Sequence, residues 1–230
     1  MHVRKARTHE PRNETVYIGA YMIKRTVLYF VPLVMLALII GSTSFFAGSP
    51  VNKAAFRDEM RTLWQDHATW TRLYIVSAVA DLPDKGPARD RLLKNQTDIG
   101  NAVKPYFGED TGEKLTSLLK EHISIAADVV SATKVKDKVK QDDATKRWYA
   151  NADEIAVFLS GANPKHWPVV EMKSMMRQHL DLTTAEVVAR LSSDWSADIA
   201  AYESVNAHIL KMADMLSDGI IQQYPKNFPL

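Results

Sequence analysis

The chain has 230 residues, with 29 Lys and Arg against 27 Asp and Glu, which gives a formal net charge of +2. Its content of 46% hydrophobic and 24% charged residues is typical of a globular protein and not of a disordered one. The chain has no cysteine, which excludes disulfides, thiolate metal sites and cysteine nucleophiles.

The charges are distributed unevenly. Residues 1–25 contain six Lys and Arg and two Glu, a net of +4, and residues 26–47 contain no charge. Residues 48–230 contain 23 Lys and Arg against 25 Asp and Glu, a net of −2. Because the excess of positive charge is confined to a short head, we expect no nucleic-acid partner.

The uncharged segment 26–47 is predicted to be a transmembrane helix. Its 22 residues would rise about 33 Å as a helix, roughly the thickness of a bilayer's hydrocarbon core. Pro32 does not exclude this, since membrane helices tolerate proline. Cations precede the segment and mixed charges follow it, so the positive-inside rule predicts a cytoplasmic head (1–25) and an extracytoplasmic, periplasmic body (48–230). The segment would contact membrane lipid.

A cleaved signal peptide is the alternative interpretation of the same segment. Cleavage after Ala47 would leave Phe45 at the −3 position, where a small residue is preferred. Cleavage after Ser49 would place Pro50 next to the scissile bond. We therefore favour a retained anchor.

Beyond the anchor, apolar residues recur at helical spacing, and the pattern indicates helices and no strand. The first helix is expected to begin at Ser49 and Pro50, as N-cap and first helical residue, and to run to about residue 80. Pro105 and Gly108 are expected to end the second helix, and residues 222–230 to be extended. The second helix is expected to cover about 88–103 and the third about 112–133. The fourth would run from the charged stretch 134–143 to about 160, the fifth would cover about 168–191, and the sixth would run from caps at 192–194 to about 221. The fold class is therefore all-α, an up-and-down bundle of about six helices.

A short pattern recurs three times in this body. Two apolar residues, two polar residues and a histidine end at His67, His122 and His179, which are 55 and 57 residues apart. Asn95 and Asn151 follow the first two histidines by 28 and 29 residues, and His208 follows His179 by 29. We interpret the body as three helical hairpins built on a shared template.

The histidines are the candidate site. Each of four has apolar residues one or two helical turns away, so we expect them to face the interior of the bundle from four helices. Imidazole together with carboxylate suits iron, zinc or copper, and bundle cores commonly hold such metals. The Glu-x-x-His spacing of diiron bundles is absent from the sequence. The candidate metal ligands are His67, His122, His179, His208, Glu121 and Glu154.

Two other interpretations of these residues stay open. A histidine on an apolar face often hydrogen-bonds to a backbone carbonyl or an Asn, which would make the histidines structural. Alternatively, Met172 and Met176 near His179, and Met212 near His208, offer thioether and imidazole ligands for Cu(I).

The segments 63–67 (LWQDH), 91–100 (RLLKNQTDIG) and 118–123 (LLKEHI) resemble a family of uncharacterised bacterial helical proteins that are secreted or membrane-anchored. The resemblance covers about residues 60–225 and leaves out the anchor. It implies a helical body outside the cytoplasm and implies no activity or site residues.

The sequence therefore predicts a single-pass membrane protein whose extracytoplasmic bundle binds a metal or senses a ligand through inward-facing histidines. The competing class is a non-catalytic structural or accessory subunit of a membrane protein complex, with histidines that only hold the core together. An enzyme ranks third, because no glycine-rich phosphate loop, serine elbow or zinc-protease motif occurs.

Overall fold

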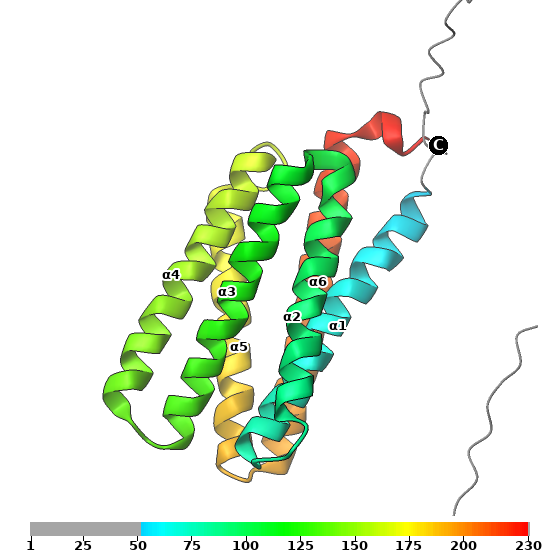
Figure 1. The fold of residues 1–230 in the computed structure, drawn as a ribbon. Helices are drawn as coiled ribbons and strands as arrows, with labels where there is room; N and C mark the ends of the chain where they lie inside the picture. The colour runs from blue at the N-terminus through cyan, green and yellow to red at the C-terminus, as the bar shows by residue number, and fades with distance from the viewer. Residues whose placement is uncertain (1–51, 230) are drawn as a thin grey trace, which may run out of the picture. The chain divides into compact units, whose positions relative to one another are not determined.

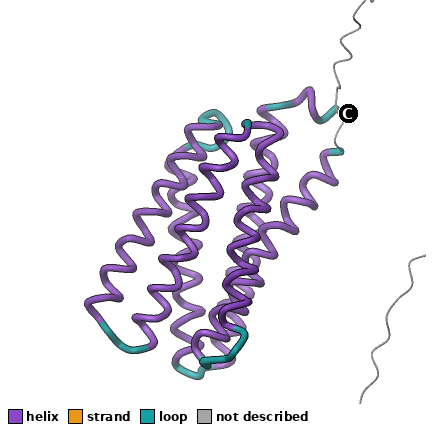
Figure 2. The backbone as a smooth tube through the Cα atoms, in the orientation of Figure 1, coloured by secondary structure: helices purple, strands orange, loops and turns teal. Residues whose placement is uncertain are grey.

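A computed structural model describes residues 52–229, and the regular structure within that range is entirely helical (Figure 1, Figure 2). The prediction of an all-α body with six helices is confirmed. A short 3₁₀ turn follows the sixth helix. The helices are α1 (Lys53–Val79), α2 (Lys85–Phe107), α3 (Glu109–Lys134), α4 (Lys138–Ala162), α5 (Val169–Leu191) and α6 (Trp195–Gln223), and the 3₁₀ turn η1 is Pro225–Asn227.

The six helices form a closed ring. Each packs mainly against the helices that precede and follow it in the chain, and α6 packs back against α1. The connections are short, so consecutive helices run in opposite directions (Figure 1). The first helix of each hairpin therefore points the same way, and α1 also contacts α3 and α5.

Local signals in the sequence explain where several helices begin. The side chain of Asn52 accepts hydrogen bonds from the amides of Ala54 and Ala55 and caps α1. Asp137 and Asp194 cap α4 and α6 in the same manner. Between α2 and α3 the chain turns at Gly108, whose φ of +88° is a conformation that residues with a side chain rarely adopt.

The prediction that Gly108 ends the second helix is confirmed, because Gly108 is the C-cap of α2. Two other expectations were wrong. Pro105 does not end α2 but lies inside its last turn, where it removes one amide donor, and the helix continues to Phe107. The tail is not extended, because α6 reaches Gln223 and η1 follows. The aromatic ring of Phe228 is 1% exposed and packs against Phe56 and Tyr106.

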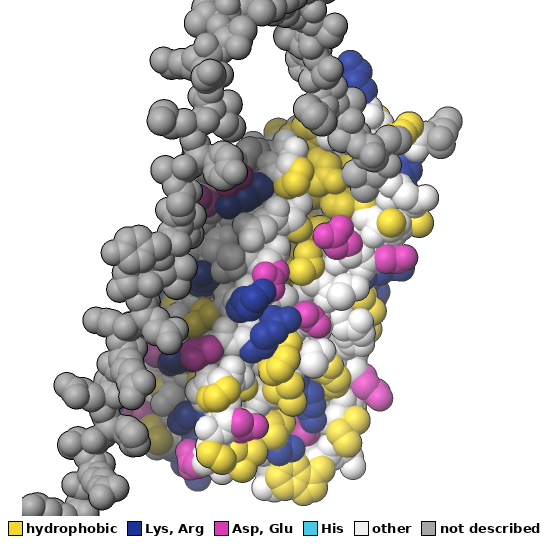
Figure 3. All heavy atoms as spheres, turned by 45° about the vertical axis from the view of Figure 1, so that its right-hand side comes forward, with side chains coloured by type: hydrophobic (Ala, Val, Ile, Leu, Met, Phe, Trp, Pro, Cys, Tyr) yellow, Lys and Arg dark blue, Asp and Glu magenta, His cyan; other side chains and the backbone are white. Residues whose placement is uncertain are grey.

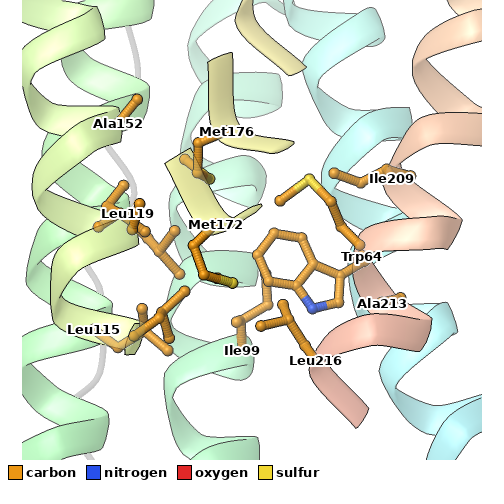
Figure 4. Close-up of a cluster of buried hydrophobic side chains, with 14 of the residues drawn as sticks. Trp64, Ile99, Leu115, Leu119, Ala152, Met172, Met176, Ile209, Ala213 and Leu216 are labelled. Carbon is orange, nitrogen blue, oxygen red and sulfur yellow. The ribbon is translucent and has the colours of Figure 1, made fainter. Parts of the chain in front are cut away.

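The larger of two apolar clusters takes in side chains from all six helices and from Phe228. Trp64 points into the middle of the bundle, among apolar side chains from α2, α3, α5 and α6 (Figure 4). A smaller cluster lies near the C-terminal ends of α1, α3 and α5 and contains Ile75, Ala78, Val130 and Val187. The two clusters are separate.

The predicted anchor, residues 26–47, and the predicted start of the first helix at Ser49 lie outside the described residues. Among residues 52–229, no helix is both long and apolar enough to cross a membrane. On the face of the molecule that Figure 3 shows, acidic and basic side chains are interspersed with apolar ones.

Candidate functional site

The four predicted histidines come together inside the bundle, one each from α1, α3, α5 and α6. His179 is at the centre of the group. Its ring centroid is 5.6 Å from that of His67, 6.4 Å from that of His122 and 6.3 Å from that of His208. All four side chains are buried. We call His67, His122, His179 and His208 the histidine layer.

One hydrogen-bond pattern recurs in all three hairpins. In each, a polar side chain of the second helix donates to the backbone carbonyl four residues before the histidine of the first helix. Asn95 Nδ2 donates to Leu63 O at 2.9 Å, and Asn151 Nδ2 donates to Leu118 O at 3.3 Å. His208 Nε2 donates to Met175 O at 3.0 Å. The residues spaced alike in the sequence thus have equivalent positions in space.

His122 has both ring nitrogens in hydrogen bonds. Trp148 Nε1 donates to His122 Nε2 at 3.1 Å, so the proton of the neutral ring is on Nδ1. That nitrogen donates to Asn151 Oδ1 at 2.8 Å. Because neither nitrogen is free, His122 in this arrangement is a structural residue that fixes α3 against α4.

The other two hairpins have different residues at the position 29 residues after the first-helix histidine. Gln96 Nε2 lies 3.2 Å from His67 Nδ1, so α2 provides a partner 29 residues after the histidine, as α4 does. In the third hairpin the residue 29 positions after His179 is His208, and its Nε2 bonds to a backbone carbonyl instead. His179 Nδ1 is buried and has no hydrogen-bond partner among the described residues. Of the three equivalent histidines, His179 is therefore the one with an unused Nδ1.

The histidine layer is uncharged at neutral pH. Burial lowers the pKa of His67 to about 3 and the pKa of His122 to about 4. Burial, reinforced by the neighbouring histidines, lowers the pKa of His179 well below its usual value. The pKa of His208 is also lowered, again mainly by burial. A cation placed in this layer would lose its hydration without gaining a counter-ion.

The two predicted carboxylate ligands are not in this layer. Glu121 and Glu154 are exposed on the outer surface, and Glu154 pairs with Lys114 at 3.4 Å. Within residues 52–229 no group of three or more His, Asp or Glu side chains is arranged to hold a metal ion. Metal binding by the histidines stays a prediction.

A pocket extends from the histidine layer toward the α1–α2 and α3–α4 turns, and α1 to α5 all contribute to its wall. Its cavity volume is about 60 Å³, less than the roughly 150 Å³ of a closed apolar cavity that admits benzene, so a ligand of that size would extend from the cavity into its open mouth. The wall repeats a pattern: each first-helix histidine is followed, one and two turns later, by two more lining residues. These are Thr71 and Ile75 on α1, Ala126 and Val130 on α3, and Thr183 and Val187 on α5.

This wall was not predicted from the sequence. Its signal was present, because residues four and eight positions after a histidine share its helical face. Thr71 and Thr183 occupy the same position after their histidines but have different hydrogen bonds. Thr183 Oγ1 donates to His179 O at 2.8 Å, whereas Thr71 Oγ1 is buried and has no partner among the described residues.

A second buried polar group was also missed. The ion-pair cluster consists of Arg72, Glu186, Arg190 and Asp198, and it joins α1, α5 and α6. Arg72 Nη1 donates to Glu186 Oε1 at 2.7 Å and to Asp198 Oδ1 at 2.8 Å, and Arg190 Nη1 donates to Asp198 Oδ2 at 3.2 Å. Both carboxylate side chains are 1% exposed. Burial raises the pKa of Glu186 to about 7, while the hydrogen bond from Arg72 lowers the pKa of Asp198.

Comparison with protein-family models, with curated proteins and with solved structures finds no match to this chain. The function is therefore argued from the geometry of the site.

Proposed function

We propose that this protein is a membrane-anchored, extracytoplasmic helical bundle that binds a small molecule in the pocket beside the histidine layer, as a sensing or accessory module. The observation that carries the proposal is the pocket itself. It lies between α1, α3 and α5, at equivalent positions of three hairpins, and the buried histidines close its inner end. Ligand sites in bundles are commonly built this way, from side chains on facing helices.

The shape of the pocket supports sensing more than storage. Five helices contribute to its wall, so an occupant would contact all three hairpins at once. A ligand that fits one arrangement of these helices better than another shifts the population between the two arrangements. The proposed anchor over residues 26–47 would keep this response at the membrane, with the pocket on the extracytoplasmic side.

The three hairpins are proposed to be copies of one template. The shared histidine, the shared donor to the carbonyl four residues earlier and the shared wall positions support this. A pocket on the axis of three such copies follows naturally, because equivalent faces of α1, α3 and α5 meet there. The hydrogen bonds of His179 and Thr71 differ from those of their counterparts in the other hairpins, so equivalent positions of the wall are not chemically identical.

The test uses the full chain in lipid nanodiscs, with benzyl alcohol as the probe and saturation-transfer NMR as the measurement. Ala126 lines the pocket, and A126L fills part of it. Ala150 is exposed on α4, so A150L adds the same atoms outside the pocket. Binding to the native chain and to A150L, with loss in A126L, would support the proposal. Equal signals from all three proteins, or from none, would refute it.

Metal binding is the second candidate, and the clustering of four imidazoles favours it. Ligating nitrogens lie about 2.0–2.1 Å from zinc, so His67, His179 and His208 would have to reorient, and His122 would have to release Trp148 or Asn151. Metal analysis of the purified chain, with thermal melting in added zinc, copper or iron, tests this. Bound metal and a higher melting temperature would support a metal site, and the absence of both would reject it.

A non-catalytic subunit of a membrane protein complex remains the alternative to both candidates. It would use the anchor and the outer surface, and the histidine layer would only hold the core. Co-purification of a larger assembly from native membranes, unaffected by A126L, would favour this alternative over ligand binding.

A further inference from the structure

The walls of the pocket contain no charged side chain. Among the described residues, none that lines it is Asp, Glu, Lys or Arg. The wall is made of aliphatic side chains, the indole of Trp148, the phenol of Tyr74, the amide of Gln141, several threonine hydroxyls and the three first-helix histidines. A charged ligand would therefore lose its hydration here and find no counter-ion, which costs several kcal/mol per charge.

The nearest charges do not change this conclusion. Arg72 and Glu186 directly adjoin the lining residues Thr71 and Val187 in the sequence, yet neither lines the pocket. Arg72 and Arg190 are already hydrogen-bonded to the carboxyl groups of Glu186 and Asp198 within the ion-pair cluster. The cluster therefore offers no free charge to a ligand.

The histidines also leave the pocket neutral. With its ring nitrogens bonded to Trp148 and Asn151, His122 is held as a neutral tautomer. His67 and His179 are buried beside it with no carboxylate in the layer that would stabilise an imidazolium. At neutral pH the inner end of the pocket is thus polar and uncharged.

Two polar atoms on this wall have unused hydrogen-bonding capacity. Thr71 Oγ1 is a buried hydroxyl, and His179 Nδ1 is a buried imidazole nitrogen, and neither has a partner among the described residues. The contrast with Thr183 shows that a helix carbonyl could have satisfied Thr71, as it satisfies its counterpart. Buried polar groups are rarely left unpaired, so these two atoms indicate where a ligand oxygen would bond.

We propose that the ligand of this pocket is an uncharged, mainly apolar molecule with a hydroxyl or carbonyl oxygen, which the hydroxyl of Thr71 recognises and the absence of charge in the wall selects. This inference rests on the proposed function and names the chemical class of its ligand. Alcohols, phenols and ketones belong to this class, and carboxylates, phosphates and amines do not.

Four probes with one carbon skeleton test the charge selection. Toluene, benzyl alcohol, benzoate and benzylammonium differ only in the group on the exocyclic carbon, and the last two are ionised at pH 7.5. With the full chain in zwitterionic nanodiscs and A126L as the baseline for lipid partitioning, the two neutral probes should bind. The two ions should bind at least roughly 100-fold more weakly than benzyl alcohol. Binding of either ion within tenfold of benzyl alcohol would overturn the inference and leave the pocket's function standing. Binding of none of the four would overturn the function itself.

Thr71→Val tests the oxygen contact. The variant replaces the hydroxyl with a methyl group of the same shape, and because that hydroxyl has no partner, the melting temperature should be unchanged or higher. Benzyl alcohol should bind roughly threefold to tenfold more weakly to T71V, whereas the affinity for toluene should not fall. T183V is the matched control, since Thr183 already donates to its own helix and its loss should leave the ratio of the two affinities unchanged. Equal changes for both probes in T71V would refute a role for Thr71.

Discussion

The bundle contains two clusters of buried polar side chains, and the cost of burying them is offset in a different way in each. The histidine layer consists of neutral rings held by amide, indole and backbone partners. The ion-pair cluster consists of charged groups that neutralise one another. A neutral network can adjoin an open pocket and offer hydrogen bonds without charge. A charged network is stable only while every charge has its partner, so it is suited to fastening helices and not to receiving a ligand.

The largest expected effect comes from removing one charge from the ion-pair cluster. Arg72→Met would leave the buried carboxylate of Glu186 without its hydrogen-bond donor and weaken the pairing of Asp198. We expect a loss of about 3–5 kcal/mol in the free energy of unfolding, measured by chemical denaturation. Arg89→Met is the control, because within residues 52–229 Arg89 pairs only with Asp90, at the surface, and should contribute less than about 1 kcal/mol. A loss no larger than that of the control would show that the cluster does not fasten the helices.

The histidine layer and Glu186 of the ion-pair cluster are expected to change the free energy of unfolding in opposite directions as the pH falls. The strongly lowered pKa values of His67, His122 and His179 mean that the unfolded chain gains three protons below pH 6.5 that the folded chain does not, and the lesser lowering of the pKa of His208 acts in the same direction. The raised pKa of Glu186 acts oppositely, because between about 4.5 and 7 the folded state holds one proton that the unfolded chain lacks. The net of two protons predicts that stability falls by up to about 3 kcal/mol per pH unit as the pH drops from 6.5 to 4.5.

Denaturation of the native chain and of E186Q over this pH range measures the effect. E186Q removes the opposing proton, so its stability should fall more steeply with acid, by up to about 4 kcal/mol per pH unit. A flat profile for the native chain would mean that the histidines become protonated in the folded state.

The next largest effect should come from His122→Ala. The change would leave Trp148 Nε1 and Asn151 Oδ1 without partners and open a cavity in the core. We expect a loss of about 2–3 kcal/mol in the free energy of unfolding. His166→Ala changes a histidine outside the histidine layer, in the connection between α4 and α5, and should cost less than about 0.5 kcal/mol. Equal costs for the two variants would mean that the layer contributes no more than a surface histidine.

The smallest effect is expected at the carboxylates that the sequence placed beside the histidines. Glu154 is more than half exposed, and its pair with Lys114 is solvated. Glu154→Gln should change the free energy of unfolding by no more than about 0.5 kcal/mol and leave binding of benzyl alcohol unchanged. A loss of ligand or metal binding in E154Q would instead place this residue at the site.

The convergence of the four histidines could be predicted because it depends on local rules. Apolar neighbours at helical spacing place His67 and His179 on inner faces. The interval from His122 to Asn151 equals the interval from His179 to His208, which indicates equivalent positions in successive hairpins. The same rules did not distinguish Glu121, which adjoins His122 in the chain but lies about 100° around the helix and is exposed. Glu121 was predicted to be a ligand because it is next to His122 in the sequence, but the two residues lie on different faces of α3.

The sequence by itself determined the all-helical class, the number of helices in the body and the inward orientation of the four histidines, because each depends on periodicity and capping within one segment. The tertiary structure decided which partner each inward polar group received. The differences between Thr71 and Thr183, and between His122 and His179, arise from contacts among different helices and are invisible along the chain. The same is true of the ion-pair cluster, in which Arg72 on α1 is more than 100 residues from its partners Glu186 and Asp198 on α5 and α6. Pairing across the bundle depends on how the helices are placed against one another, and only the folded structure contains that information.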